Sequence, residues 1–272
     1  ATSGDTGSAV ANGFLGVAGT KVVVLYPSGK VSEIQEKQFT TLSQNVTALE
    51  VDGTFDDCQR LVKQAFLDQE LKKKYFLTSA NSINIARLIP QTFYYFYAYS
   101  RLPSETNPVV FSVPSGNFGN LTGGLLAKKM GLPIQKFIAS TNINDVVPEY
   151  LSSKSFNPRP SKQTISNAMD VGNPSNFVRM LDLFHGDFES LSNEIVGYAF
   201  TDEETQHAMR DVFSRTNYVM DPHGAVAYLG LKKFLRSGDA NAYGIFAETA
   251  HPAKFKEVVD KTLNISIPIP DE

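Results

Sequence analysis

The sequence Pro-Ser-Gly-Asn-Phe-Gly-Asn at residues 114–120 combines the residue types that bind a phosphate group. Its glycines let the backbone approach an anion closely and adopt conformations that other residues avoid. Ser115, Asn117 and Asn120 add side-chain hydrogen-bonding groups. The pattern is neither a Walker loop, which needs Gly-Lys-Ser/Thr, nor the G-x-G-x-x-G dinucleotide fingerprint. It therefore predicts a phosphate site of another kind, with an ordinary turn rich in Gly and Asn as the alternative.

This loop joins a predicted strand to a predicted helix. Residues 109–113 are apolar and mostly β-branched, which is typical of a buried strand in a parallel sheet. Residues 121–130 place leucines and a methionine at helical spacing. A helix start carries unpaired N–H groups and the positive end of the helix dipole, and both favour phosphate. Because ligands of open α/β sheets bind at the carboxyl ends of strands, the loop lies where a ligand is expected.

A second polar segment, Thr-Ser-Ala-Asn-Ser-Ile-Asn at 78–84, precedes a predicted helix at 85–100. Ser82 lies just before its first turn, and Arg87 follows about one and a half turns later. A hydroxyl and a guanidinium in this arrangement could meet one anion, and guanidinium matches phosphate geometry. The alternative for Arg87 is a surface ion pair, which contributes little. Two anion sites together suggest a phosphorylated cofactor facing a second anionic ligand.

Strands and helices alternate along the sequence, with short connections. The predicted strands are 21–26, 46–51, 109–113, 135–139 and 242–247, and the predicted helices include 8–17, 32–42, 55–71, 85–100, 121–130, 173–184, 203–216 and 221–235. Such alternation predicts an α/β fold with parallel sheets and right-handed crossovers. We expect three layers in two domains, a smaller one at 1–80 and a larger one at 81–272, with the site between them.

Composition excludes several classes of protein. The 272 residues carry a formal net charge of −3 with mixed signs, so neither a nucleic-acid face nor a polybasic membrane patch is indicated. No apolar run reaches the length of a membrane span. Cys58 is the one cysteine in the sequence, so no internal disulfide is possible; we expect it to face the core. The sequence begins Ala-Thr-Ser-Gly-Asp without an initiator Met, which leads us to expect a fragment.

Two further polar segments follow predicted strands. Residues 140–145 come directly after the strand at 135–139, and residues 248–254 come after the strand at 242–247. Each leads from a strand end toward a helix start, as do residues 114–120, which we call the phosphate loop. His223 lies near another helix start and could belong to the site, although we favour a capping or packing role for it.

Six motifs, in this order, resemble the threonine synthase family, whose members use pyridoxal phosphate and have a tryptophan-synthase-β-like fold. They are A-T-S-G-D-T-G at 1–7, L-Y-P-S-G-K at 25–30, S-A-N-S-I-N-I-A-R at 79–87, V-P-S-G-N-F-G-N at 113–120, S-N-A-M-D at 166–170 and T-A-H-P-A-K-F at 249–255. Each motif is modest by itself, but together they are specific. The resemblance covers essentially the whole chain.

The resemblance implies roles for individual residues. The residues expected to hold the cofactor phosphate are Ser115, Gly116, Asn117, Phe118, Gly119 and Asn120. Thr249 would face the pyridine nitrogen with a hydroxyl, which leaves that nitrogen largely unprotonated. The turn expected to grip the substrate in the smaller domain contains Thr2, Ser3, Asp5 and Thr6. Ser82 and Arg87 would hold the substrate phosphate, with Asn120 as a further candidate.

The implied reaction converts O-phospho-L-homoserine and water to L-threonine and phosphate, the last step of threonine biosynthesis. It is an elimination and hydration in which the cofactor ring is the electron sink. The resemblance further implies a cytoplasmic enzyme that is a monomer or weak dimer, without a metal. The family carries its Schiff-base lysine upstream of A-T-S-G-D-T-G, and Lys254 belongs to a different motif. We therefore expect this chain to be inactive alone, and no catalytic residue is assigned.

Two alternatives stay open from the sequence. Another pyridoxal-phosphate lyase of this fold, such as a threonine dehydratase relative, would lack a site for substrate phosphate. Ser82 and Arg87 distinguish that lyase from a threonine synthase. A non-catalytic threonine-synthase-like binding protein would keep the motifs without the Schiff-base lysine.

Overall fold

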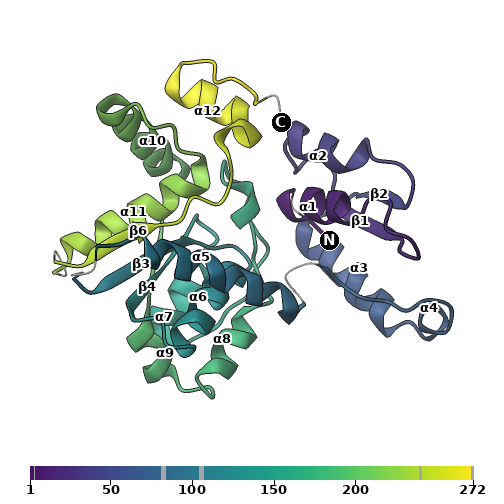
Figure 1. Ribbon diagram of the computed structural model, residues 1–272, viewed down its shortest axis with the longest axis horizontal. Coiled ribbons are helices and arrows are strands. Elements are labelled where there is room, and N and C mark those ends of the chain that lie inside the picture. Colours follow the sequence, from purple (N-terminus) through teal and green to yellow (C-terminus); the bar gives the residue numbers. More distant parts are fainter. Residues whose placement is uncertain (3, 81–83, 104–106, 239–240, 271–272) are drawn as a thin grey trace. The chain divides into compact units, whose positions relative to one another are not determined.

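The computed structural model describes residues 1–2, 4–80, 84–103, 107–238 and 241–270. The chain forms two compact units, Ala1–Asn84 and Ile85–Glu272. In each unit, parallel strands are connected by helices (Figure 1). This arrangement confirms the predicted α/β fold class with parallel sheets.

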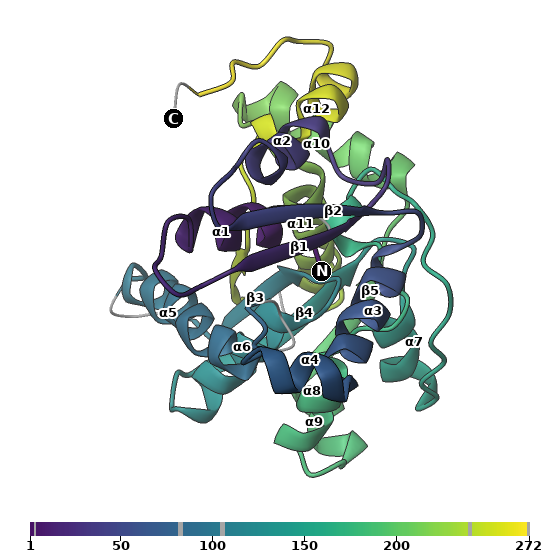
Figure 2. The same cartoon turned by 90° about the vertical axis from the view of Figure 1, so that its right-hand side faces the viewer.

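The first unit is built on two strands. β1 (Val22–Pro27) and β2 (Val46–Val51) pair in parallel and lie side by side in Figure 2. The helices of this unit are α1 (Asp5–Gly13), α2 (Glu33–Thr40), α3 (Phe55–Leu67) and α4 (Gln69–Lys74). Alternate β1 side chains, Val24 and Tyr26, enter a core with Phe39, whose ring lies edge-on to Tyr26 at 5.1 Å. Cys58 is fully buried, as predicted.

Two helices of this unit differ from their predicted bounds. The helix predicted at 8–17 begins at Asp5 instead, because the Thr2 hydroxyl accepts the N–H groups of Gly4 and Gly7 and turns the chain earlier. The helix predicted at 55–71 is two helices. It breaks at Asp68, whose extended backbone leaves the helix and whose carboxylate accepts the Leu71 N–H at 2.9 Å to start α4.

The second unit contains a four-stranded parallel sheet in the order β5-β4-β3-β6. Its strands are β3 (Val109–Pro114), β4 (Ile134–Thr141), β5 (Ile195–Ala199) and β6 (Tyr243–Phe246). Strand β5 was not among the predicted strands. It lies at the edge of the sheet, where most of its residues are only half-buried, and Gly197 interrupts its run of apolar residues, which weakens the strand signal.

Helices cover both faces of this sheet. They are α5 (Leu88–Ser100), α6 (Gly119–Lys129), α7 (Val146–Ser153), α8 (Phe177–Leu183), α9 (Phe188–Glu194), α10 (Asp202–Thr216), α11 (Pro222–Arg236) and α12 (Lys256–Leu263). Phe111 of β3 faces α5 and α6, whereas Val110 faces α11, so the unit has the expected three layers. The predicted helix 85–100 begins with a 3-10 turn, Ile85–Arg87, and the helix predicted at 173–184 begins at Phe177.

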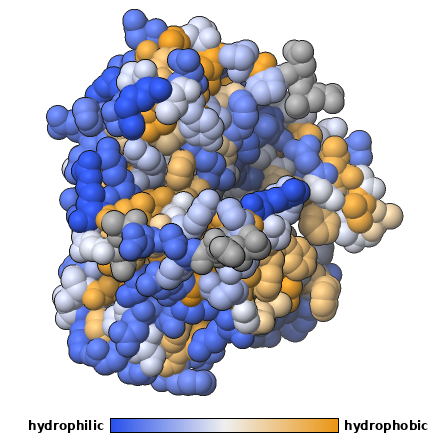
Figure 3. Space-filling model, turned by 60° about the vertical axis from the view of Figure 1, so that its left-hand side comes forward, coloured by the Kyte–Doolittle hydropathy of each residue, from blue (hydrophilic) through white to orange (hydrophobic). Residues whose placement is uncertain are grey.

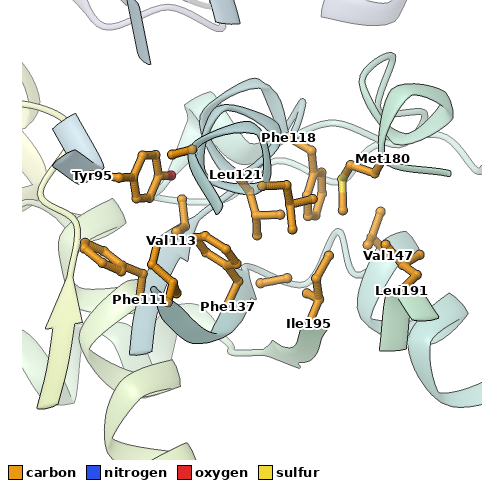
Figure 4. Close-up of a cluster of buried hydrophobic side chains, with 14 of the residues drawn as sticks. Tyr95, Phe111, Val113, Phe118, Leu121, Phe137, Val147, Met180, Leu191 and Ile195 are labelled. Carbon is orange, nitrogen blue, oxygen red and sulfur yellow. The ribbon is translucent and has the colours of Figure 1, made fainter. Parts of the chain in front are cut away.

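The main core lies between β3, β4 and helices α5 and α6. Phe137 is fully buried there, and its ring centroid lies 5.8 Å from that of Tyr95 and 6.3 Å from that of Phe111 (Figure 4). Leu121, from the first turn of α6, and Phe118, which precedes that helix, enter the same cluster. Phe118 of the loop at residues 114–120 and Leu121 directly after it are therefore anchored in the core.

The surface is mixed in character. On the face shown in Figure 3, hydrophilic residues are interspersed with apolar ones. No helix among the described residues is both long enough and apolar enough to span a bilayer.

Replacing the N-cap residue of α10 is expected to weaken the second unit. The Thr201 hydroxyl accepts the Glu204 N–H at 3.2 Å, and the Glu204 carboxylate accepts the Thr201 N–H at 2.8 Å. Thr201→Ala removes this capping box and should lower the free energy of unfolding by about 1 kcal/mol. Urea denaturation measures the loss. Thr201→Ser keeps the hydroxyl and should cost much less; equal losses in both variants would contradict the capping explanation.

Candidate active site

Residues 114–120 form the turn from β3 into α6, as predicted. The Ser115 N–H donates to the Ser140 carbonyl at 2.9 Å, which ties the loop to the end of β4. Phe118 has left-handed backbone angles, φ 60° and ψ 17°, immediately before the helix. Such a residue next to helical ones forms a backbone concavity that suits an anion. The N–H groups of Gly119 and Asn120, at the start of α6, have no acceptor within the helix.

The polar side chains of the loop hold its shape. Asn120 donates from Nδ2 to the Pro114 carbonyl at 2.7 Å, and its Oδ1 accepts the Leu121 N–H at 2.9 Å. Asn117 accepts the Ser175 N–H at 2.6 Å. The buried Ser115 hydroxyl lies 3.3 Å from the Asn120 Oδ1. The sequence suggested these side chains as phosphate ligands, but Ser115 and Asn120 bond to each other within the loop and Asn117 bonds to Ser175 before α8. This favours backbone N–H groups as the anion donors.

Gly116 allows a close backbone contact under the loop. A Cβ atom at this position would lie 2.7 Å from the Ala168 carbonyl oxygen and 2.7 Å from the Met169 Cα. Backbone atoms occupy that space, so a larger residue would have to displace the loop. The concavity at Phe118 and this close approach fit a loop that wraps a phosphate group.

A buried polar cluster supports the segment that contacts Gly116. Asn142, after β4, donates to the Thr164 hydroxyl at 2.8 Å and to Asp170 Oδ1 at 2.9 Å. The Thr164 N–H donates to the other Asp170 oxygen at 2.9 Å. Burial raises the pKa of Asp170 to about 6, although hydrogen bonds from Thr164 and Asn142 oppose the increase. The polar run after β4 thus anchors residues 166–170 beneath the phosphate loop.

The chain after β6 lies beside the phosphate loop. The Ala247 N–H donates to the Ser112 carbonyl of β3 at 2.9 Å, which brings Glu248 and Thr249 to the carboxyl end of the sheet. A cavity of about 660 Å³ opens there, lined by residues that include Arg87, Asn120 and Thr249. Three residues predicted for the site from distant parts of the sequence therefore line one cavity of the second unit.

Arg87 contributes a positive charge to the wall of this cavity. Burial lowers its pKa, but a guanidinium stays protonated in proteins. A partly buried positive charge beside the carboxyl ends of parallel strands is suited to hold a phosphate or carboxylate.

The predicted substrate turn lies in the first unit. The buried Thr2 hydroxyl accepts the Gly7 N–H at 2.7 Å, and Asp5 begins α1. Thr6 and Thr2 help to line a cavity of about 200 Å³ within this unit. Ser3 and Ser82, which were also predicted to contact substrate, lie outside the described residues.

Two ionisable groups near the cavity, His223 and Glu248, were not assigned to the site from the sequence. His223 is buried against Phe255 with ring centroids 4.6 Å apart, as a packing role predicts, but it also bonds to Asp221. Glu248 follows an apolar strand directly, a position where an acidic residue signals a possible functional role. Within the described ranges, no group of three or more His, Cys, Asp or Glu residues is arranged to hold a metal ion.

Comparisons with known proteins identify the family to which this chain is similar. Residues 1–243 match the family described as pyridoxal-phosphate dependent enzyme. The chain is 52% identical over 274 residues to the threonine synthase of Escherichia coli (strain K12), covering 100% of this chain and 63% of that protein. It aligns with the crystal structure of E. coli threonine synthase with a TM-score of 0.92, over 99% of this chain and 62% of the other.

A structure described as pyridoxal-phosphate-bound threonine synthase from Brucella melitensis is 35% identical, with a TM-score of 0.87, over 99% of this chain and 63% of that one. The chain thus spans somewhat less than two thirds of the length of these relatives. Because the family match covers residues 1–243, this chain belongs to the family of pyridoxal-phosphate-dependent enzymes.

Proposed function

We propose that this chain is part of a threonine synthase, a carbon–oxygen lyase that converts O-phospho-L-homoserine and water to L-threonine and phosphate. The observation that carries the proposal is the 660 Å³ cavity lined by Arg87, Asn120 and Thr249. It supplies a cation for a substrate phosphate next to the loop suited to a cofactor phosphate. The sequence identity of 52% to E. coli threonine synthase supports the same assignment.

The proposed cofactor contacts come from two strand ends. The backbone of residues 115–120 would hold the phosphate of pyridoxal phosphate, and the Thr249 hydroxyl would meet its pyridine nitrogen. When bound, this cofactor supplies an electron sink for carbanions formed on the substrate. A hydroxyl partner, unlike a carboxylate, does not favour protonation of the pyridine nitrogen.

The proposed substrate contacts orient O-phospho-L-homoserine by its charged ends. Arg87, together with Ser82, would bind the substrate phosphate and stabilise the negative charge of phosphate as it leaves. Thr2, Ser3, Asp5 and Thr6 would grip the α-carboxylate. Asp5 is itself anionic, so its backbone rather than its carboxylate would serve there.

Proton transfer at Cα and Cβ of the substrate requires a base. No lysine is among the described residues that line the cavity. This supports the prediction that the Schiff-base lysine belongs to another part of the enzyme and that the chain alone is inactive. A monomeric or weakly dimeric state and a cytoplasmic location stay predictions.

A chimera tests the proposed function. Residues 1–272 would replace the aligned residues of E. coli threonine synthase, and phosphate and L-threonine formed from O-phospho-L-homoserine would be measured. We expect turnover by the chimera and none by residues 1–272 alone. A folded chimera that binds pyridoxal phosphate but deaminates L-threonine would favour the dehydratase alternative. One that binds the cofactor and turns over neither substrate would favour a non-catalytic binding protein.

Arg87→Ala in this chimera is expected to lower kcat/KM for O-phospho-L-homoserine about 100-fold. The loss of two charge-assisted hydrogen bonds, about 3 kcal/mol in total, corresponds to that factor. Pyridoxal phosphate binding should change little, because its phosphate is assigned to a different group. Arg210→Ala, at an exposed arginine of α10, is the matched control. Unchanged kcat/KM in the Arg87 variant would remove the predicted substrate-phosphate site.

A further inference from the structure

Glu248, the residue before Thr249, reaches the start of α11. Its carboxyl shares a hydrogen bond with Asp221, the N-cap residue of that helix. A Cβ atom on Gly224 would overlap with the Oε2 and Cδ atoms of Glu248. The carboxyl therefore occupies the space that a glycine leaves in the first turn of α11. Although residue 248 as a whole is exposed, its carboxyl is packed against the helix.

Asp221 connects the Glu248 carboxyl, through His223 and Ala168, to the phosphate loop. It is fully buried, accepts the His223 N–H at 2.8 Å, and its Oδ1 lies 2.7 Å from the His223 Nδ1. The other ring nitrogen of His223 accepts the Ala168 N–H at 3.2 Å. This pattern assigns the ring proton to Nδ1, which donates to an ionised Asp221. Ala168 in turn is the residue whose carbonyl contacts Gly116 in the phosphate loop.

Two adjacent carboxyls in a hydrogen bond hold one proton between them. Burial opposes ionisation of Asp221, but hydrogen bonds from His223 keep its pKa below the usual value. Burial, the hydrogen bond to Asp221 and the charge of Asp221 raise the pKa of Glu248 to about 9. The shared proton therefore resides on Glu248, which donates to Asp221. Of the other titratable groups, Tyr218 interacts with the charges of both Glu248 and Asp221, Asp170 interacts with His223, and Arg87 lines the same cavity as Glu248.

We propose that Glu248 is a positioning residue whose anchored carboxyl fixes the backbone of Thr249 on α11, while Asp221, His223 and Ala168 extend this anchor to the phosphate loop. The two ends of the cofactor site, Thr249 and residues 115–120, are thereby held at a set separation. That pyridoxal phosphate is the group bound between them rests on the proposed function. The contacts that form the anchor do not depend on it.

The anchor makes the stability of the second unit depend on pH between about 4.5 and about 9. A folded-state pKa raised above the unfolded value of 4.5 means that the full contribution to stability is present below about pH 4.5. This contribution falls as pH rises and is lost by about pH 9, where the folded state also ionises. Glu248→Gln keeps a donor for Asp221 and has no proton to lose, so it should remove this pH dependence.

NMR on the 272-residue chain without cofactor tests the proposal. Glutamate labelled with ¹³C at its side-chain carboxyl reports ionisation, and a ¹³C-labelled threonine methyl reports the position of Thr249, assigned by Thr249→Ser. We expect one carboxyl resonance, absent in Glu248→Gln, to titrate several pH units above the others. The Thr249 methyl should shift with the same midpoint in the parent chain and show no such shift in Glu248→Gln.

Two further variants test the assignment of the signals to Glu248, one next to it and one as a control. Asp221→Asn should move the Glu248 midpoint toward that of ordinary glutamates, because it removes the neighbouring negative charge. Glu257→Gln, at an exposed residue of α12, should leave both signals unchanged. A Glu248 carboxyl that titrates near pH 4.5, or a Thr249 methyl that ignores its ionisation, would overturn the proposal. Since no turnover is measured, failure of the chimera assay and failure of this test are distinguishable.

Discussion

Gly116→Ala is expected to weaken binding of pyridoxal phosphate at least about 100-fold in the threonine synthase chimera. The added Cβ would lie 2.7 Å from a carbonyl oxygen and 2.7 Å from a Cα, both backbone atoms of the segment beneath the loop. A flexible side chain could move away, but this segment is held by the Asp170 cluster. The loop must shift instead, and its backbone N–H groups would no longer point toward the phosphate of the cofactor.

The expected factor follows from those N–H groups. Each hydrogen bond to a charged acceptor contributes about 1.5–3 kcal/mol, and the loss of two corresponds to 100-fold or more. Equilibrium dialysis with pyridoxal phosphate measures the affinity, and thermal unfolding checks that the variant is folded. Gly13→Ala, a helical position with open space around its Cβ, is the control and should bind normally. Binding within threefold of the parent by Gly116→Ala would show that the loop tolerates the displacement.

The phosphate loop was predictable because its signal is local. Apolar β-branched residues, a run of Gly and Asn, and then leucines at helical spacing specify a strand, a turn and a helix within a few residues. The structure places β3, the loop and α6 in that order. What the pattern could not specify is which atoms face the ligand. The Asn120 side chain bonds within the loop and that of Asn117 bonds to Ser175, and neither contact can be read from the local sequence.

Contacts between distant segments explain the other differences. Nothing near Glu248 in the sequence indicates that its carboxyl meets Asp221, because the two are brought together by the packing of α11 on the sheet that contains β6. Likewise the early start of α1 depends on the single hydroxyl of Thr2, which has no periodic signature. The shared cavity of Arg87 and Thr249 could be expected from the family resemblance, but their spacing in the sequence carries no such information.

Phe137→Ala is expected to lower the free energy of unfolding of the second unit by about 3–5 kcal/mol. The ring is fully buried in the centre of β4 and packs against Tyr95 and Phe111, so its removal leaves a cavity in the core (Figure 4). Urea denaturation of the 272-residue chain measures the change. Phe93→Ala on α5, where the ring is 61% exposed, should alter stability by no more than about 0.5 kcal/mol.

The core around Phe137 also supports the phosphate loop. Ser140, at the end of β4, accepts the Ser115 N–H at 2.9 Å, so a displaced β4 would carry the phosphate loop with it. Phe137→Ala in the chimera should therefore weaken pyridoxal phosphate binding, whereas Phe93→Ala should not. Phe137→Leu, which restores most of the volume, should recover most of both losses. If stability falls by several kcal/mol while cofactor affinity stays unchanged, the loop is held by the Asp170 cluster beneath it and not by β4.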